Sequence, residues 1–195
     1  AKSTGYDIRS DVITKGISSM KNSLKNTLDP TTKAYIFYSI VIADSKEIEK
    51  YKHELDKLLE ENINDYARSL IAMTYNIMGE KELALAVVND LENRAKSAGD
   101  NTSYWEGQSF HYNWQDDKVQ TTAMGLKALV NIKGSSELKN KIIRWLMMQR
   151  MGLSWRNTQE TALIIYAMVD YLKNSTELAP DYNVKVFING EKLYE

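Results

Sequence analysis

The chain has 195 residues, of which 43% are hydrophobic and 26% are charged, a balance that predicts a packed globular domain rather than disorder. Its 25 basic and 26 acidic residues give a net charge of −1, so no one-sided basic field favours nucleic acid or an anionic membrane. Because cysteine is absent, disulfides, cysteine–metal sites and a thiol nucleophile are excluded. The longest apolar run, residues 34–43, is far shorter than the roughly 20 residues of a membrane span, and no signal peptide is evident.

Taken in chain order, helical segments of two kinds alternate along the sequence. Those with a single apolar stripe are residues 7–26, 46–61, 80–97 and 136–149. Those that are apolar on almost every side are residues 33–43, 65–78, 118–132 and 158–172. A striped helix buries one face, whereas a helix that is apolar all round is buried on most sides. The alternation therefore predicts an all-α fold in which outer helices surround a layer of inner helices.

One motif, Ala-x-x-Φ-x-(Ala/Ser)-Φ with Φ a large apolar residue, recurs in each broadly apolar segment. The four copies begin at Ala34, Ala67, Ala123 and Ala162, so the spacings are 33, 56 and 39 residues. A tetratricopeptide array would keep a spacing near 34 residues throughout, so the irregular spacing favours a ring over a solenoid. Small residues in the motif let inner helices approach closely where a ring narrows. The sequence thus predicts an incomplete α/α toroid of about four helical hairpins.

Pro180 separates the helices from a final segment of a different kind. Residues 182–188 alternate in part between polar and apolar side chains, and Asn189-Gly190 follows them. Asn-Gly between two short apolar runs is a strong hairpin signal. We therefore predict two units: a toroid over residues 1–178 and, over residues 181–195, a β-hairpin or the first strand of a following β domain.

The segment 99–117, between the second and third motif copies, is unusually rich in aromatic and polar residues. Aromatic platforms beside carboxylates suit carbohydrate, so one interpretation is a ligand cleft at one end of the toroid. The candidate binding residues of this interpretation are Trp105, Glu106, His111 and Trp114. The other interpretation is a long loop that its aromatic side chains hold in place, with no ligand.

The same segment offers an acid/base pair, because Glu106 with Asp116 or Asp117 could cleave a glycosidic bond. Alternatively, one of the two aspartates caps the next helix. A metal site shared by His53 and His111, the two histidines, is not expected, since His53 lies among Lys and Glu on an outer-helix segment. The sequence has no phosphate-binding loop, nucleophile elbow, HExxH or dinucleotide fingerprint, so no catalytic residue, metal or cofactor is assigned.

Three segments in the second half of the chain resemble, in order and spacing, the C-terminal half of the thioester domain of the α2-macroglobulin and complement family. They are NWQDDKVQTTAMGLKAL at residues 113–129, IRWLMMQR at 143–150 and SWRNTQETA at 154–162. In that family a Trp-containing loop, an inner helix, an Arg/Lys-Trp-Leu outer helix, a Ser-Thr-Gln turn and another inner helix follow one another. A β-strand of the next domain then begins, and residues 182–195 fall where it is expected.

The resemblance covers roughly residues 30–195 and implies an α/α toroid, usually of six hairpins, from a bacterial protein that traps or inhibits proteases. The family's reactive element is a thioester between cysteine and glutamine, whereas this chain has no cysteine. Either that element lies outside this chain, or the protein is of the type that lacks it. The resemblance therefore implies a non-enzymatic helical scaffold in the periplasm or outside the cell. Its partners would be neighbouring domains of the same protein and, indirectly, proteases.

Four hairpins leave a six-hairpin ring open, so an exposed apolar flank is expected near residues 7–40 or 158–175. A dimer through this open edge, or coverage by the terminal hairpin, would bury the flank. Two other functions stay open at this point. One is an α/α-toroid carbohydrate-active enzyme with its site on residues 99–117, and the other is a helical-repeat binding module of another kind.

Overall fold

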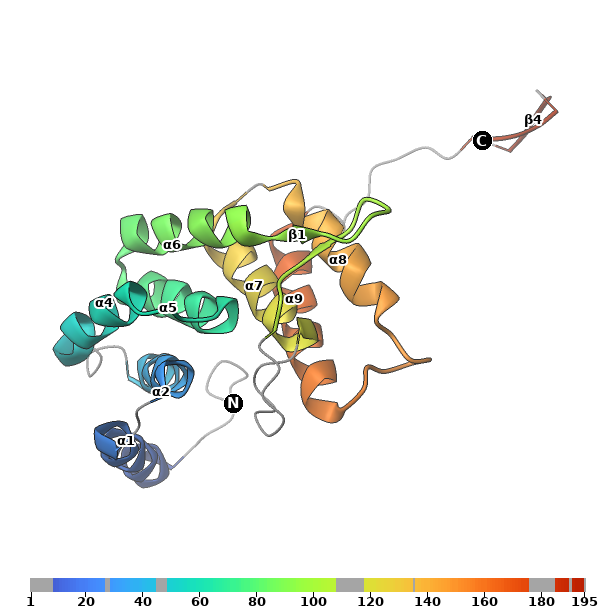
Figure 1. Cartoon of the computed structure of the whole chain (residues 1–195). Helices are drawn as coiled ribbons and strands as arrows, with labels where there is room; N and C mark the ends of the chain where they lie inside the picture. The colour runs from blue at the N-terminus through green and yellow to red at the C-terminus, as the bar shows by residue number, and fades with distance from the viewer. Residues whose placement is uncertain are drawn as a thin grey trace.

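The computed structural model describes residues 9–26, 29–44, 49–107, 118–134, 136–175, 185–189 and 191–194. Within these residues the chain is mainly helical (Figure 1). The helices that match the striped segments are α1 (Ser10–Asn26), α4 (Lys52–Glu60), α6 (Lys81–Arg94) and α8 (Leu138–Met148), with the 3-10 helix η2 (Glu49–Tyr51) before α4. The helices that match the broadly apolar segments are α2 (Pro30–Ala43), α5 (Asp65–Met78), α7 (Lys118–Ile132) and α9 (Thr158–Lys173).

The four inner helices pack side by side in the order α2, α5, α7 and α9. Their N-termini lie at the same end of this row. Asn64 Nδ2 at the start of α5 donates to Thr31 Oγ1 of α2 at 2.9 Å. Gln159 Nε2 of α9 donates to Gln120 Oε1 of α7 at 3.4 Å. The inner helices are therefore parallel, as in a ring built from repeated helical hairpins.

The row of inner helices is curved. Burial and, to a smaller extent, the negative charge of Asp170 on α9 raise the pKa of Tyr38 on α2 to about 12, so the first and last inner helices lie within reach of each other's charge. Outside the row, α1 and α4 pack on α2, α6 packs on α5 and α7, and α8 packs on α7. This two-layer arc is the incomplete α/α toroid predicted from the sequence, and four outer–inner helix pairs are present among the described residues.

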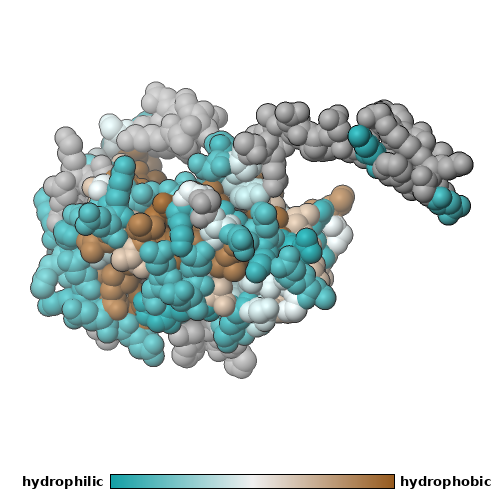
Figure 2. Space-filling model, turned by 90° about the horizontal axis from the view of Figure 1, so that it is seen from above, coloured by the Kyte–Doolittle hydropathy of each residue, from teal (hydrophilic) through white to brown (hydrophobic). Residues whose placement is uncertain are grey.

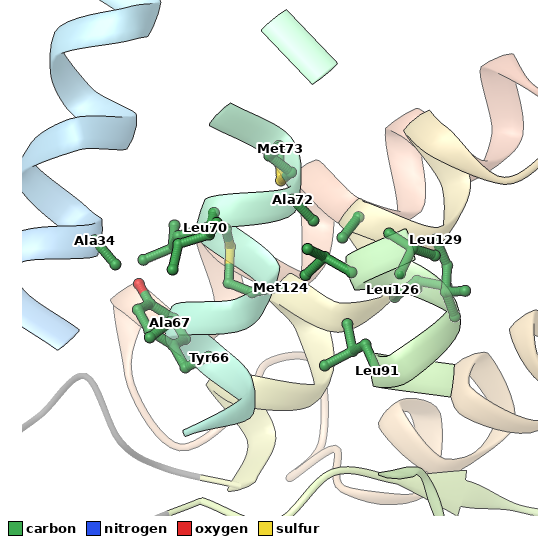
Figure 3. Packing of buried hydrophobic residues seen from close by; sticks show 14 of the residues in the cluster. Ala34, Tyr66, Ala67, Leu70, Ala72, Met73, Leu91, Met124, Leu126 and Leu129 are labelled. Carbon is green, nitrogen blue, oxygen red and sulfur yellow. The ribbon is translucent and has the colours of Figure 1, made fainter. Parts of the chain in front are cut away.

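Burial follows the predicted layers at α1, α5 and α7, whereas α9, which was predicted to be buried on most sides, has three buried residues, fewer than the four of the outer helix α8. Helix α1 contains no buried residue, whereas nine residues of α5 and ten of α7 are buried. In Figure 3, Leu70 of α5 points toward Ala34 of α2, and Leu126 of α7 lies on the other side of α5. The motif alanines Ala34, Ala67 and Ala123 are fully buried, so their small side chains lie where neighbouring helices approach most closely.

The outer helices cover the core with one face and leave the other to solvent. On α6, for example, Ala84, Val88 and Leu91 are fully buried, while the remaining surface carries several charged side chains. Figure 2 shows the molecule from above relative to Figure 1. The face in view is mostly hydrophilic, and apolar side chains appear in narrow patches between polar ones. A single apolar stripe is therefore enough to hold each outer helix on the inner layer.

The ends of the inner helices follow local sequence signals. Asn64 caps α5 by accepting a hydrogen bond from the Ala67 N–H at 2.7 Å, and Asn157 caps α9 by accepting from the Glu160 N–H at 2.8 Å. Helix α5 ends at Gly79, whose φ of 87° lies in the left-handed region that glycine adopts without strain. The two asparagines thus fix where the chain enters α5 and α9, and Gly79 fixes where it leaves α5.

Two short antiparallel hairpins complete the described chain. Strands β1 (Lys96–Ser97) and β2 (Ser103–Tyr104) pair after α6, so the prediction of helix to residue 97 followed by a loop from residue 99 was wrong. The turn between them uses residues 99–101, all with positive φ. Strands β3 (Val186–Ile188) and β4 (Glu191–Tyr194) confirm the predicted C-terminal hairpin. The domain boundary predicted between residues 178 and 181 lies outside the described residues and stays a prediction.

Candidate functional site at the ends of the inner helices

Trp105 lies in the segment that the sequence singled out for ligand binding. Its side chain is fully buried, and its indole Nε1–H donates to the Leu91 carbonyl of α6 at 2.7 Å. The Thr122 hydroxyl of α7 accepts from the Trp105 backbone N–H at 3.1 Å and donates to the Trp105 carbonyl at 3.3 Å. Gly125 leaves room for the ring, since a Cβ at that position would lie 2.5 Å from two ring carbons. Trp105 thus belongs to the core and fixes the incoming chain against α7.

Glu106, the next residue, lies at the surface among positive charges. Its carboxylate accepts a hydrogen bond from the Tyr104 hydroxyl at 3.1 Å and lies 3.2 Å from Lys118 Nζ and 3.8 Å from Lys96 Nζ. Burial acts to raise the pKa of Glu106, but the hydrogen bonds from Lys118 and Tyr104 outweigh it and hold this pKa below its usual value. A carboxyl group that stays ionised is poorly suited to act as a general acid.

The remaining residues singled out in this segment lie outside the described part of the chain. They are His111, Trp114, Asp116 and Asp117. The ligand-binding and acid/base roles that the sequence suggested for these four residues therefore stay predictions.

The described residues show neither a cluster of metal ligands nor a helix that could span a membrane. His53 is exposed on α4, as its position among Lys and Glu predicted. In the described ranges, no three His, Asp or Glu side chains come together as metal ligands would. None of the helices in that part of the chain combines the length and the apolarity that crossing a membrane requires.

The N-terminus of α9 holds a buried carboxylate. Glu160 is 1% exposed, and its Oε1 accepts hydrogen bonds from Asn157 Nδ2 and Arg156 Nε, both at 2.9 Å. Arg156 Nη2 lies 2.7 Å from the same oxygen. The Asn157 side chain thus caps the helix by accepting from the Glu160 N–H and at the same time donates to the Glu160 carboxylate. A negative charge at a helix N-terminus is favourable, so this group stabilises the turn into α9.

Polar side chains, three of them buried and Gln159 half-buried, gather where the first turns of α7 and α9 meet, and we call this group the α7–α9 junction. Its members are Gln120, Thr121, Gln159 and Glu160. Gln120 and Thr121 are each 1% exposed, and Thr121 Oγ1 has no hydrogen-bond partner among the described residues. A buried hydroxyl without a partner is uncommon, and both helix dipoles point their positive ends here. The junction can therefore hold a carbonyl or carboxylate oxygen of an adjacent segment, and it is the best candidate site.

Sequence reasoning did not identify the α7–α9 junction as a site. Its residues lie in the family-like segments 113–129 and 154–162, where short polar runs precede broadly apolar helices. Polar residues in a first turn are usually helix caps that face water. Here three of the four are buried because a second inner helix begins beside them, which only the packing of α7 on α9 reveals.

Parallel inner helices, an outer layer and polar first turns at one end define an α/α-toroid domain. A family model described as A-macroglobulin TED domain matches residues 55–171, more than half of the chain. The chain belongs to this family, as the resemblance of its sequence implied. No curated protein gives a significant match. In macroglobulins the TED domain is a non-catalytic, thioester-bearing part of larger, generally extracellular proteins, whereas this chain has no cysteine.

Proposed function

We propose that the chain is a non-enzymatic helical scaffold of a bacterial macroglobulin-like protein that traps or inhibits proteases, and that it forms no thioester of its own. Membership of the TED-domain family supports a place in such a multidomain protein. The absence of cysteine is the observation that carries the proposal, because it removes the one covalent chemistry associated with this domain. What is left is a set of packed helices with defined caps and a buried core, which suits a scaffold.

The proposal places this scaffold in the periplasm or outside the cell, in contact with neighbouring domains of its own polypeptide. The generally extracellular location of the family supports this assignment. Proteases would be reached indirectly, because the cleavage that begins capture in this family lies outside the domain. The domain would then keep the neighbouring domains in fixed positions relative to one another while they enclose the protease.

Digestion of a large and a small substrate tests the trapping role. The full-length protein that contains this chain is incubated with an endoprotease, and hydrolysis of casein and of a chromogenic peptide is followed. We expect casein hydrolysis to fall strongly and peptide hydrolysis to persist, because a small substrate can still diffuse to an enclosed protease. Equal inhibition of both substrates, or inhibition of neither, would contradict trapping.

A second measurement tests the scaffold role without a thioester. Radiolabelled methylamine, which opens thioesters, is added to the protein before and after protease treatment. Peptide mapping should find no label within residues 1–195, and the isolated chain should leave protease activity unchanged. Label on any glutamine of this chain would show that it takes part in covalent chemistry, and the proposal would then be wrong.

A further inference from the structure

The outer helices α1 and α4 both pack on α2, and a pocket lies between them that we call the α1–α4 pocket. These three helices lie together at one end of the arc (Figure 1). Four apolar side chains line the pocket: Leu24 of α1, Phe37 of α2, Tyr51 of η2 and Leu58 of α4. Its volume is about 350 Å³, and small-molecule sites usually have about 300–1,000 Å³. The pocket is therefore large enough for a small ligand.

The floor of the pocket is formed in advance by the core. Phe37 and Leu58 are 1% and 2% exposed and belong to the main apolar cluster. The rings of Phe37 and Tyr51 pack with their centroids 5.7 Å apart and their planes tilted by 43°. Leu24 and Tyr51 are half-buried, so they form the walls between this floor and the solvent. A ligand would therefore find an apolar surface that needs no rearrangement of the core.

The charged side chains that line the pocket are mostly positive. They are the four lysines Lys21, Lys25, Lys33 and Lys57 and the two glutamates Glu54 and Glu61. Four positive and two negative charges give +2, whereas the whole chain carries −1. Lys25, Lys33 and Lys57 form no ion pair with another described residue. Both glutamates lie on or just after α4, so the sides formed by α1 and α2 carry lysines alone.

The pocket is separate from the apolar faces at the two ends of the inner row. Tyr35 of α2 and Ile165 of α9 are 40% and 48% exposed, which confirms the exposed flank expected near residues 7–40 or 158–175. A dimer through these faces stays a prediction. Lys33 and Phe37, one turn apart, share a different face of α2 from Tyr35. The α1–α4 pocket is thus bounded by neighbouring elements within residues 21–61 and not by an end of the row.

We infer that the α1–α4 pocket binds a medium-chain fatty acid, with the alkyl chain on the apolar floor and the carboxylate among the lysines of α1 and α2. Lysine can lay its apolar stem along such a floor while its ammonium group stays at the water, and Lys33 is half-buried. An ammonium group donates strong hydrogen bonds to a carboxylate. A methylene group takes up about as much space as a water molecule, about 30 Å³, so the pocket has room for roughly ten carbons. The inference goes beyond the scaffold role and does not depend on protease trapping.

Isothermal titration calorimetry with a series of saturated fatty acids, each kept below its micelle concentration, tests the pocket. We expect the affinity of the wild-type chain to rise by up to about fourfold per methylene from hexanoate to decanoate, because each methylene leaves water. From decanoate to tetradecanoate the gain should stop, since the pocket is then full. Decan-1-ol, which has the same chain without the charge, should bind about tenfold more weakly or less. Absence of decanoate binding, an affinity that keeps rising to tetradecanoate, or equal binding of the alcohol would overturn the inference.

Two variants test the charge and the shape of the pocket separately. The double change Lys25→Gln with Lys33→Gln should weaken decanoate binding by about tenfold, because it removes two positive charges near the carboxylate. Its matched control is Lys15→Gln with Lys81→Gln, two exposed lysines that do not line the pocket. Equal effects of the two double variants would show that only the overall charge of the chain matters, and would overturn the inference.

Leu24→Trp should fill the pocket and abolish binding. Helix α1 has no buried residue, so the fold should tolerate the change, which an unchanged melting curve verifies. Val12→Trp adds the same ring at a position of α1 that is 53% exposed and outside the pocket, and it should bind decanoate as the wild type does. Undiminished binding by Leu24→Trp would contradict the assignment.

Photolabelling locates the bound chain. Decanoate with a diazirine near its terminal carbon is irradiated with the protein, and the labelled peptides are mapped. We expect label within residues 21–61, and excess unmodified decanoate should prevent it. Label mainly within residues 162–169, on the exposed face of α9, would show binding to any open apolar surface and would overturn the inference. The casein assay is independent of all these outcomes.

Discussion

A Cβ added to Gly125 of α7 would lie 2.5 Å from Cε3 and Cζ3 of Trp105, closer than side-chain atoms normally approach. A glycine inside a helix usually weakens it, but here the missing side chain makes room for the largest fully buried residue. The ring in turn reaches the Leu91 carbonyl through its Nε1–H. This one contact therefore links α6, the chain after β2 and α7.

Gly125→Ala should destabilise the protein. In an open helix the change gains about 1 kcal/mol, but insertion of a methyl group into a packed core costs about 1–3 kcal/mol. We expect the second effect to win, because Trp105 is enclosed and its Nε1–H is hydrogen-bonded. Urea denaturation measures the free energy of unfolding. Gly16→Ala on α1 is the control: its Cβ would meet nothing within 4 Å, and it should stabilise by about 0.5–1 kcal/mol. Equal stabilisation by both changes would show that the Trp105 contact is not close.

The layer arrangement could be predicted because it depends on side-chain patterns within each helix. Residues 65–78, for example, are apolar on almost every side, and in the structure α5 is buried between α2 and α7. Residues 10–26 have one narrow stripe, and α1 has no buried residue. The C-terminal hairpin was also predictable, since Asn189-Gly190 is a local turn signal and Asn189 has a φ of 52°.

The place of Trp105 and the α7–α9 junction could not be predicted, because both depend on neighbours distant in sequence. A tryptophan in a polar segment suggests a ligand platform until Gly125, twenty residues later in sequence, is seen to accommodate its ring. Gln120 and Gln159 meet only because α7 and α9 begin side by side. The hairpin of β1 and β2 is too short to show a strand pattern in sequence.

Thr122→Val should destabilise, whereas Thr121→Val should be neutral or stabilising. The Thr122 hydroxyl bonds both the N–H and the carbonyl of Trp105, so its loss leaves buried backbone groups unpaired, at a cost of about 1–3 kcal/mol. The neighbouring Thr121 hydroxyl is equally buried and has no partner among the described residues, so valine removes an unsatisfied group. Thermal and urea unfolding of the two isosteric variants compares them directly. A larger loss in Thr121→Val would indicate that its hydroxyl is bound after all.

Asn64→Ala should lower the free energy of unfolding, because it removes the N-cap of α5 and a hydrogen bond between α2 and α5. Asn64 accepts from the Ala67 N–H as the N-cap of α5 and donates to Thr31 of α2. Loss of an N-cap costs about 1–2 kcal/mol, and the hydrogen bond to Thr31 is lost with it. Asn76→Ala, near the other end of α5, is the control and should change the free energy of unfolding by less than about 0.5 kcal/mol. Similar effects of both changes would contradict a capping role.

Acid should weaken the contact between α6 and the end of α7 through Glu92. Its carboxylate accepts from Lys133 and Ser136, and although burial acts to raise the pKa of Glu92, these hydrogen bonds outweigh it and lower the pKa below its usual value. A lowered pKa stabilises the folded state above the unfolded-state value of about 4.3, and this contribution is lost as the pH falls through the lower folded-state value.

The wild-type chain should therefore lose more stability than Glu92→Gln as the pH falls from about 5 through the unfolded-state pKa to the lowered folded-state one. Urea unfolding at each pH gives the two curves, which should converge at the acid end because protonated Glu92 can no longer pair with Lys133. Glu82→Gln on the exposed side of α6 is the matched control and should run parallel to the wild type. If the curves of wild type and Glu92→Gln stay parallel instead, the hydrogen bonds to Lys133 and Ser136 do not stabilise the charged form of Glu92, and α6 is held on α7 by its apolar residues alone.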